Sequence, residues 1–509
     1  MAEMMQGIKD LKLDIRSSVN DAMAASLAIQ GRGSLNTTSS QPPIRQMFIP
    51  HAALNRFLRE LLRDPTATFK TPEQAEALEV VLAGVRHILL IGPTAMGKTL
   101  VYLLPAFLRT KGITCVLLPL SALHLDFDRR CKEFKIPSSR WLPGINESPS
   151  TRIVYVSPEH AQTLKFTNYL IEMARLGTIV QFVIDEAHLL PLHSGFRFCL
   201  SALRPLVSSG EYNLSRSTVL GTISTLHIGV PFLLMTATCP PSLRSQLLSH
   251  LGIVDCHVIH APTDRPEISY NVKLYPTLDE AKDKLVSYVR RQLTSAANDS
   301  SFRGLVYCRS KDQVEELASI LGCKPFHADR PAEERAVSFQ DWVDGKQKFM
   351  VCTSLLGCGI DVQGVCAVYH FGTPWSILDF AQESGRGGRG GKPSISLVFA
   401  GRDESEPENG DDLYGKKTMR EWVLRKSQCR RITLSSFLDG GRMTCMLLKG
   451  ASLCDFCRAQ SKEEHPKNLV EFPTQAILDG DIPRPRRLAH VPPTSLSYEM
   501  GRTQPIPDQ

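Results

Sequence analysis

Short apolar runs alternate with longer amphipathic stretches through the middle of the chain. Because a strand buried on both faces reads as a continuous apolar run, this alternation predicts βαβ units and a parallel sheet covered by helices on both sides. A second block of the same kind follows the first. The pattern therefore predicts an α/β protein with two parallel-sheet domains in tandem. The apolar runs lie at residues 87–91, 114–118, 152–157, 180–184 and 231–236 in the first block, and at 304–308, 349–353, 367–370 and 394–399 in the second.

The two ends of the chain have compositions that can bury little apolar surface. Residues 1–48 begin with a weakly amphipathic segment, for which we expect a short helix, and continue into a stretch rich in Gly, Ser, Thr and Pro. Residues 466–509 are rich in Pro and Arg. Both ends are therefore predicted to be disordered. Between them we expect domains at residues 49–262 and 263–402, followed by a small cysteine-containing subdomain at residues 403–465.

The turn after the first apolar run carries the most specific chemical pattern in the chain. It matches G-x-x-x-x-G-K-[ST], with a predicted strand before it and a predicted helix after it. Gly92 and Gly97 let successive N–H groups point at a bound anion, while Lys98 would reach the β- and γ-phosphates and Thr99 would bind Mg²⁺. A plain Gly-rich turn is the alternative, which the flanking elements disfavour. The predicted nucleotide-binding loop comprises Gly92, Pro93, Thr94, Ala95, Met96, Gly97, Lys98 and Thr99.

Polar residues follow two other strands of the first block, where ligands bind on open parallel sheets. Asp185, Glu186 and His188 come directly after residues 180–184, Thr236 ends the run at 231–236, and Thr238 follows two residues later. An Asp at the end of a buried strand suits Mg²⁺ coordination beside a phosphate loop, and a neighbouring carboxylate can activate the attacking water. A chance acidic pair on the surface is the alternative for Asp185 and Glu186.

The second block carries Gln-Glu-Ser-Gly-Arg-Gly-Gly-Arg at residues 382–389 but no phosphate loop. A flexible basic loop is one interpretation of this segment. The other is that Arg386 and Arg389 reach across a cleft to the nucleotide, where an Arg stabilises the charge that develops on the γ-phosphate. The nucleotide-binding block that precedes them favours the second interpretation.

Composition and charge say more about where in the cell the protein is found than about its function. With 42% hydrophobic and 22% charged residues, the 509-residue chain has an ordinary globular composition, and its net charge of +7 permits a polyanionic partner without requiring one. Its 14 cysteines are irregularly spaced, which favours reduced thiols over a disulfide framework. We find no secretory leader and no apolar run near the ~20 residues of a membrane span, so we expect an intracellular protein without membrane insertion.

Taken in order, these motifs resemble those of superfamily 2 helicases, and within them the RecQ-like DNA helicases, over about residues 65–460. Beyond the segments already described, the resemblance rests on a Gln motif at 69–74, motif Ia at 118–123, an inter-domain link at 264–266, motif IV at 307–310 and motif V at 353–361. It implies two RecA-like domains that hydrolyse ATP with Mg²⁺ at their interface. It also implies 3′ to 5′ movement on single-stranded DNA, unwinding of duplexes with a 3′ tail, and a nuclear location.

The resemblance assigns roles to individual residues. Gln74 would read adenine, although Thr71 and Pro72 begin a helix on which a Gln would ordinarily face solvent. Arg386 and Arg389 would be the arginine fingers, and His188 would couple nucleotide state to the DNA-binding face. The other residues carried over are Gln382 at the catalytic site, Asp361 at the nucleotide, and Phe196, Arg197, Thr236, Thr238, Arg309, Thr353 and Ser354 at the coupling and nucleic-acid contacts.

The cysteines at 429, 445, 454 and 457 resemble the zinc platform that follows the motor in this family. Four thiolates suit tetrahedral Zn²⁺, and the C-x2-C pair is typical of such sites. The family's middle spacing is shorter, which makes Cys445 the least certain ligand, and free thiols are the alternative. The predicted ligands are Cys429, Cys445, Cys454 and Cys457.

The sequence also departs from the family. Residues 185–188 correspond to the family's motif II in its DEAH form, and the loop after them lacks the family's DNA-sensing Trp and has His193 near that position. Only 52 residues follow Cys457, so we expect no winged-helix domain. Two alternatives therefore stay open: an RNA helicase or duplex translocase of the same superfamily, and a catalytically silent nucleic-acid-binding remnant. The sequence does not identify a protein partner.

Overall fold

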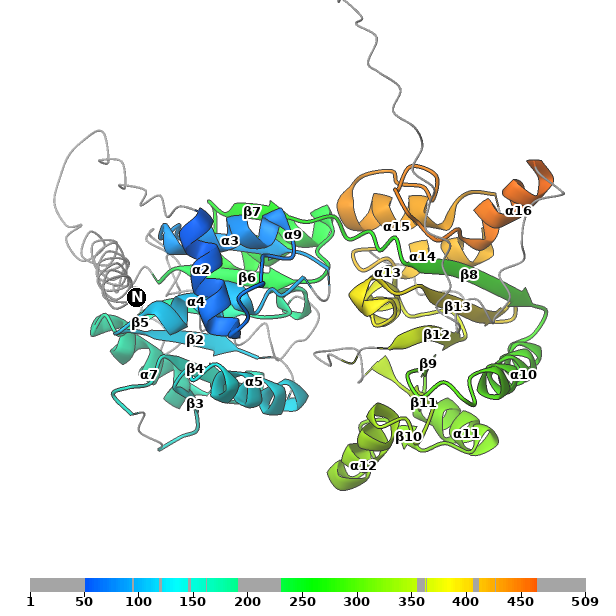
Figure 1. Cartoon of the computed structure of the whole chain (residues 1–509), viewed down its shortest axis with the longest axis horizontal. Coiled ribbons are helices and arrows are strands. Elements are labelled where there is room, and N and C mark those ends of the chain that lie inside the picture. The colour runs from blue at the N-terminus through cyan, green and yellow to red at the C-terminus, as the bar shows by residue number, and fades with distance from the viewer. Residues whose placement is uncertain are drawn as a thin grey trace, which may run out of the picture. The chain divides into compact units, whose positions relative to one another are not determined.

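The computed structural model describes residues 51–464, apart from 94–95, 119–120, 145–147, 162, 191–229, 355–361, 363, 406–411 and 426 (Figure 1). Two sheets organise this part of the chain. The first has seven strands in the order β3-β4-β2-β5-β6-β1-β7, and the second has six in the order β10-β11-β9-β12-β13-β8. All strand pairings among the described residues are parallel, which confirms the predicted tandem of parallel-sheet domains.

The first sheet is built around β1, whose side chains are all buried. Its partners β6 and β7 continue the register in parallel on either side. The strands are β1 (His87–Ile91), β2 (Ile113–Leu117), β3 (Ser138–Arg140), β4 (Ile153–Val156), β5 (Ile179–Ile184), β6 (Phe232–Thr236) and β7 (His257–His260). The helices are α2 (His51–Leu62), α3 (Pro72–Leu82), α4 (Leu100–Leu108), α5 (Ser121–Glu133), α6 (Pro158–Ala161), α7 (Leu164–Arg175) and α9 (Pro241–Leu251), with a short 3-10 helix η1 (Ala187–Leu189) after β5.

The second sheet begins with its own edge strand, β8, which pairs with β13 along its whole length. The strands are β8 (Ile268–Tyr275), β9 (Arg303–Cys308), β10 (Pro325–Phe326), β11 (Phe349–Cys352), β12 (Val365–Phe371) and β13 (Ser394–Gly401). The helices are α10 (Leu278–Ser295), α11 (Lys311–Leu321), α12 (Ala332–Val343), α13 (Ile377–Ser384) and the 3-10 helix η4 (Arg389–Gly391), and then α14 (Lys416–Leu424), α15 (Arg430–Asp439) and α16 (Asp455–Glu464).

Burial of a titratable side chain in the first sheet makes stability depend on pH. His87 begins β1 and is buried beside Phe232, and burial, helped by the charge of Arg86, lowers its pKa to about 4. Below its ordinary pKa of about 6.5 the unfolded chain binds a proton that the folded chain does not bind until about pH 4. The free energy of unfolding therefore falls as the pH falls through this window.

We expect His87 to contribute about 2 kcal/mol to the loss of stability between pH 7.5 and pH 5. Urea unfolding of the wild type and His87→Leu at both pH values measures this contribution. The variant should lose less stability than the wild type over the same interval. An identical loss in both proteins would contradict the assignment to His87.

Candidate functional site

The predicted phosphate loop lies between β1 and α4. Lys98 Nζ donates hydrogen bonds to the carbonyl oxygens of Gly92, at 2.7 Å, and Pro93, at 3.3 Å. A Cβ at Gly92 would lie 2.2 Å from Met96 Sδ, and Gly97 has a φ of +85°. Gly97 is therefore needed for the backbone course that holds Lys98 over the loop, whereas a side chain at Gly92 would displace Met96.

Gln74 is buried and attached to the same loop. Thr71 caps α3 by accepting from Gln74 N at 3.1 Å, which confirms the predicted start of this helix. The Gln74 amide donates to Gly97 O at 3.0 Å and accepts from Lys70 N at 2.8 Å. The alternative in which Gln74 faces solvent is therefore wrong. The part of Gln74 in reading adenine stays a prediction.

Asp185 and Glu186 follow β5 and lie in the electrostatic field of Lys98. Burial lowers the pKa of Lys98, and the charges of Glu186 and Asp185 oppose that shift. Burial, together with the charge of Glu186, raises the pKa of Asp185 to about 7. Two carboxylates and one ammonium group therefore share a largely desolvated space, where a divalent cation would offset the repulsion between the carboxylates.

The backbone at Glu186 is held in an uncommon conformation. Its φ is 49°, in the left-handed region that non-glycine residues rarely adopt, and its N–H donates to Asp185 Oδ1 at 2.9 Å. Glu186 Oε2 is buried and lies 3.5 Å from His188 Nδ1, and no hydrogen bond to it is found within the described part of the chain. A buried carboxylate oxygen of this kind can accept a proton from a water molecule placed beside it.

His188 connects three of the predicted motifs. Its Nδ1 lies 2.9 Å from Thr236 Oγ1, and its Nε2 lies 2.7 Å from the amide nitrogen of Gln382. Since an amide nitrogen can only donate, His188 Nε2 accepts and Nδ1 carries the proton. Thr236 Oγ1 in turn donates to Thr238 O at 2.8 Å. One directed hydrogen-bond chain thus runs from Gln382 through His188 to Thr238.

Arg386 and Arg389 follow α13 and are both buried. Their positive charges act in the same direction as burial and lower the pKa of Lys98. Both arginines therefore act electrostatically on Lys98, and their part as arginine fingers stays a prediction.

The loop that carries these arginines is held by a residue that the sequence did not single out as functional. Arg265 donates to Gly385 O at 3.0 Å and to Gly387 O at 2.9 Å, and its Nε lies 2.6 Å from Glu267 Oε1. Arg265 belongs to the segment between β7 and β8. Only its place in the predicted inter-domain link could have drawn attention to it.

The predicted nucleic-acid contacts in the second domain lie at the carboxyl ends of strands. Arg309 follows β9 and pairs with Glu404, with 3.2 Å between Nη1 and Oε2. Thr353 and Ser354 follow β11, and Thr353 N donates to Phe326 O at 3.3 Å. Five predicted site residues lie outside the described part of the chain: Thr94, Ala95, Phe196, Arg197 and Asp361.

The four predicted zinc ligands form one buried cluster. Their sulfur atoms all lie within 4.8 Å of one another, with Cys429 Sγ 3.6 Å from Cys445 Sγ and 3.9 Å from Cys454 Sγ. Ligands at the Zn–S distance of about 2.3 Å sit about 3.8 Å apart around a tetrahedral ion. Hydrogen bonding with the sulfurs of Cys445 and Cys454 lowers the pKa of Cys429 to about 2. The cluster, Cys445 included, therefore fits Zn²⁺.

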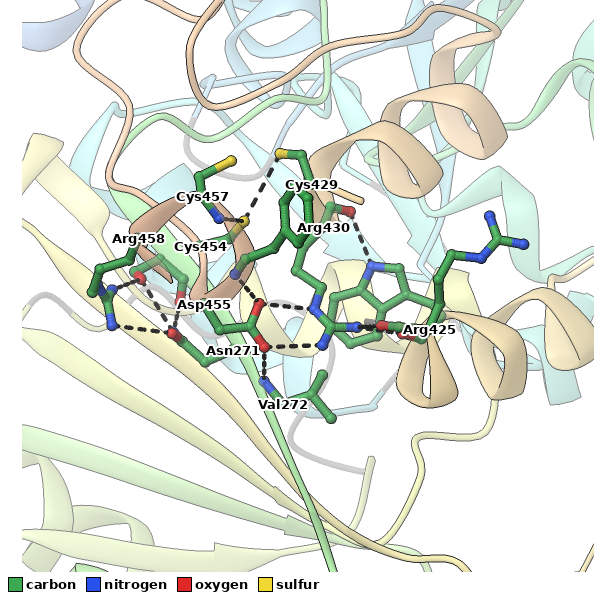
Figure 2. A network of polar contacts seen from close by, with 12 residues as sticks. Asn271, Val272, Arg425, Cys429, Arg430, Cys454, Asp455, Cys457 and Arg458 are labelled. Atoms are coloured by element: carbon green, nitrogen blue, oxygen red, sulfur yellow. Dashed lines mark hydrogen bonds and ion pairs between the residues drawn. The ribbon is translucent and has the colours of Figure 1, made fainter. Parts of the chain in front are cut away.

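A network of charged side chains joins this cluster to the second sheet (Figure 2). Asp455 follows Cys454 in the chain. Arg430 donates two hydrogen bonds to the Asp455 carboxylate, from Nε and from Nη2, both at 2.9 Å. The same carboxylate accepts from Val272 N, on the edge strand β8, at 3.0 Å. Arg458 adds a hydrogen bond to Ser269 Oγ at 2.9 Å. The cysteine cluster thus covers an open edge of the sheet, and its loss would expose that edge.

Comparisons with known proteins agree with this geometry. Residues 71–245 match the DEAD/DEAH box helicase family, and residues 284–391 match the helicase conserved C-terminal domain. The chain is 28% identical over 360 residues to ATP-dependent DNA helicase Q5 of Rattus norvegicus, which covers 67% of this chain and 35% of the relative. It is 29% identical over 413 residues to a putative ATP-dependent DNA helicase Q1 of Caenorhabditis briggsae, which covers 75% of this chain and 62% of the relative.

The fold is also found among solved structures. Mss116p bound to single-stranded RNA and AMP-PNP superposes with a TM-score of 0.55 at 18% identity, covering 69% of this chain and 73% of that one. This likeness confirms the RecA-like architecture of both domains.

Among the described residues, no helix combines the length and the apolar character that a membrane span requires.

The chain matches only part of the length of each curated relative. The chain spans about a third of the length of the rat relative and about three fifths of the nematode one. The matched segments contain the phosphate loop, the DEAH residues and the paired arginines in the expected order. The predicted resemblance is therefore confirmed: the chain is similar to RecQ-like ATP-dependent DNA helicases, and its two sheet domains match the two helicase domain families.

Proposed function

We propose that the chain is an ATP- and Mg²⁺-dependent DNA helicase that moves 3′ to 5′ on single-stranded DNA and unwinds duplexes carrying a 3′ tail. The observation that carries this proposal is the field around Lys98, to which Asp185 and Glu186 contribute from one domain and Arg386 and Arg389 from the other. A protein that only binds nucleic acid has no need for these five groups to converge. This convergence disfavours the alternative of a silent remnant.

Each group has a role in the proposed hydrolysis. Thr99 and Asp185 would hold Mg²⁺, which when bound neutralises charge on the β- and γ-phosphates. Lys98 binds the same phosphates in place of the loop carbonyls that it now contacts. Glu186 orients the attacking water and accepts its proton at Oε2, the buried oxygen for which no hydrogen bond is found among the described residues. Arg386 and Arg389 stabilise the departing γ-phosphoryl group.

The chain of hydrogen bonds through His188 supports coupling of hydrolysis to movement. Gln382 belongs to the second domain, while His188 and Thr236 belong to the first. A change in the nucleotide beside Glu186 would move His188, and with it the contact to Gln382. Relative motion of the two domains would then advance the chain along the strand, with affinity for DNA coming mainly from phosphate contacts.

We also propose that the cysteine cluster binds one structural Zn²⁺ and that the protein acts in the nucleus. The sulfur geometry supports the first proposal. The second rests on the similarity to RecQ-like DNA helicases. Neither proposal affects the assignment of the ATP site.

The test of the proposed function compares the wild type with Lys98→Ala. We expect ATP hydrolysis that single-stranded DNA stimulates, with near-complete loss in the variant because the ammonium group that binds the β- and γ-phosphates is gone. The same two proteins are then tested on duplexes with a 3′ or a 5′ tail, and only the wild type should unwind, and only the 3′-tailed duplex.

The alternatives give different results in this experiment. Equal, low hydrolysis in both proteins would overturn the enzyme assignment and favour the silent remnant. Stimulation by single-stranded RNA but not by DNA would favour the RNA helicase. Preference for the 5′-tailed duplex would overturn the proposed polarity alone.

A further inference from the structure

One of the chain's four tryptophans is exposed. Trp375 lies in the turn between β12 and α13, and 49% of its surface is open to solvent. The other three, Trp141, Trp342 and Trp422, are at most 5% exposed. An exposed indole leaves a large apolar surface in water, so its position suggests contact with a ligand rather than core packing.

The ring of Trp375 lies against the charged side chain of Arg309. The guanidinium carbon of Arg309 lies 4.2 Å from the ring centroid, a stacking distance. Arg309 is itself held by Glu404, whose side chain is only 4% exposed. Glu404 also accepts from Thr373 N at 2.8 Å and from Gly401 N at 3.0 Å. A buried carboxylate thus holds the guanidinium in place, and the guanidinium in turn supports the indole.

The three side chains follow the carboxyl ends of three neighbouring strands in the second sheet. Arg309 follows β9, Trp375 follows β12 and Glu404 follows β13. These strands are parallel and adjacent, so their carboxyl ends lie together, which is where open α/β sheets bind ligands. β11, which pairs with β9, ends at Cys352, so Thr353 follows it at the carboxyl end of the same sheet.

We propose that Trp375, backed by Arg309 and Glu404, is a stacking platform for an unpaired base of single-stranded DNA. This inference rests on the proposed function, which makes single-stranded DNA the ligand of the chain. A ring held rigidly in its binding orientation loses little conformational entropy when a base stacks on it. The guanidinium of Arg309 is paired with Glu404, so its part is to hold the ring, and the stacking surface of the indole is what the platform offers a base. Stacking is tolerant of sequence, so the platform suits a protein that moves along DNA.

The test uses fluorescein-labelled oligo-dT and measures affinity by anisotropy at low salt without nucleotide. Trp375→Ala should bind about tenfold more weakly than the wild type, the effect of losing one stacked base. Trp375→Phe retains an aromatic face and should bind within about twofold of the wild type. Val337→Ala, which alters another exposed apolar residue of the same domain, should bind as the wild type does.

Intrinsic fluorescence gives a second, independent readout. Because the remaining tryptophans are buried, unlabelled oligo-dT should quench the emission of the wild type and leave that of Trp375→Phe unchanged. Thermal melting of the variants verifies that they are folded. Wild-type affinity in Trp375→Ala, or quenching that persists in Trp375→Phe, would overturn the platform.

Failure of this inference is distinguishable from failure of the proposed function. Binding is measured without ATP, so a wild type that binds oligo-dT through Trp375 but hydrolyses no ATP would contradict the helicase and support the platform. A wild type that hydrolyses ATP in response to DNA, with unchanged DNA affinity in Trp375→Ala, would support the helicase and overturn the platform. A wild type that binds no oligo-dT would overturn both.

Discussion

Arg389→Ala is expected to lower kcat for ATP hydrolysis by about 10³ to 10⁵, the range measured for arginine fingers. Arg389 is buried, and its positive charge contributes to lowering the pKa of Lys98, as we expect of a finger in the proposed nucleotide site. The guanidinium stabilises charge that develops only in the transition state. Affinity for ATP should therefore change far less than kcat.

Hydrolysis at saturating single-stranded DNA, together with binding of a fluorescent ATP analogue, separates these two effects. Arg389→Lys keeps the charge but loses the planar fork, and we expect an intermediate loss. Arg290→Ala removes an exposed arginine from α10 of the same domain and serves as the control. A kcat for Arg389→Ala within tenfold of the wild type would contradict its assignment as a finger.

Removing the metal from the cysteine cluster is expected to cost several kcal/mol of stability, because structural zinc sites in small domains contribute about 10 kcal/mol or more. Cys454 is fully buried and adjoins Asp455, which anchors both Arg430 and the edge strand β8 (Figure 2). Loss of the ion would separate the sulfurs and release this network. We therefore expect a large drop in Tm both on chelation and in Cys454→Ser.

Metal analysis of the purified protein should find one zinc ion per chain, and less in Cys454→Ser. Cys366→Ser, which alters a half-buried cysteine outside the cluster, should retain the zinc and most of the stability. A protein that contains no zinc and whose Tm is insensitive to chelators would show that the four thiols pack without a metal.

The hydrophobic pattern predicted the interior strands and missed the edges. Each interior strand of both sheets corresponds to an apolar run, whereas β3, β7, β8 and β10 were not predicted. These four are the edge strands of the two sheets. An edge strand has a neighbour on one side only and is partly exposed, so its sequence mixes polar and apolar residues. The signal that identifies a parallel sheet is therefore absent at its margins.

Some residues of the site can be predicted from a local sequence motif, and others depend on contacts with residues far away in the chain. The phosphate loop and the DEAH residues each lie within a few residues of a strand end, so spacing alone identifies them. Arg265 contacts Gly385 and Gly387, more than a hundred positions further along the chain, and Trp375 depends on Arg309 and Glu404. Such partners are brought together by the topology of the sheet. No local pattern marks them.

The two carbonyl contacts of Arg265 have a mechanical consequence. Arg265 lies on the backbone that leads from the last strand of one sheet to the first strand of the other, and it grips the turn from which Arg386 projects. Because Arg265 hydrogen-bonds two carbonyl groups of this turn, a rotation of the backbone at Arg265 would displace the turn and Arg386 with it. A substitution that loosened Arg265 should therefore lower the rate of ATP hydrolysis more than the affinity for ATP.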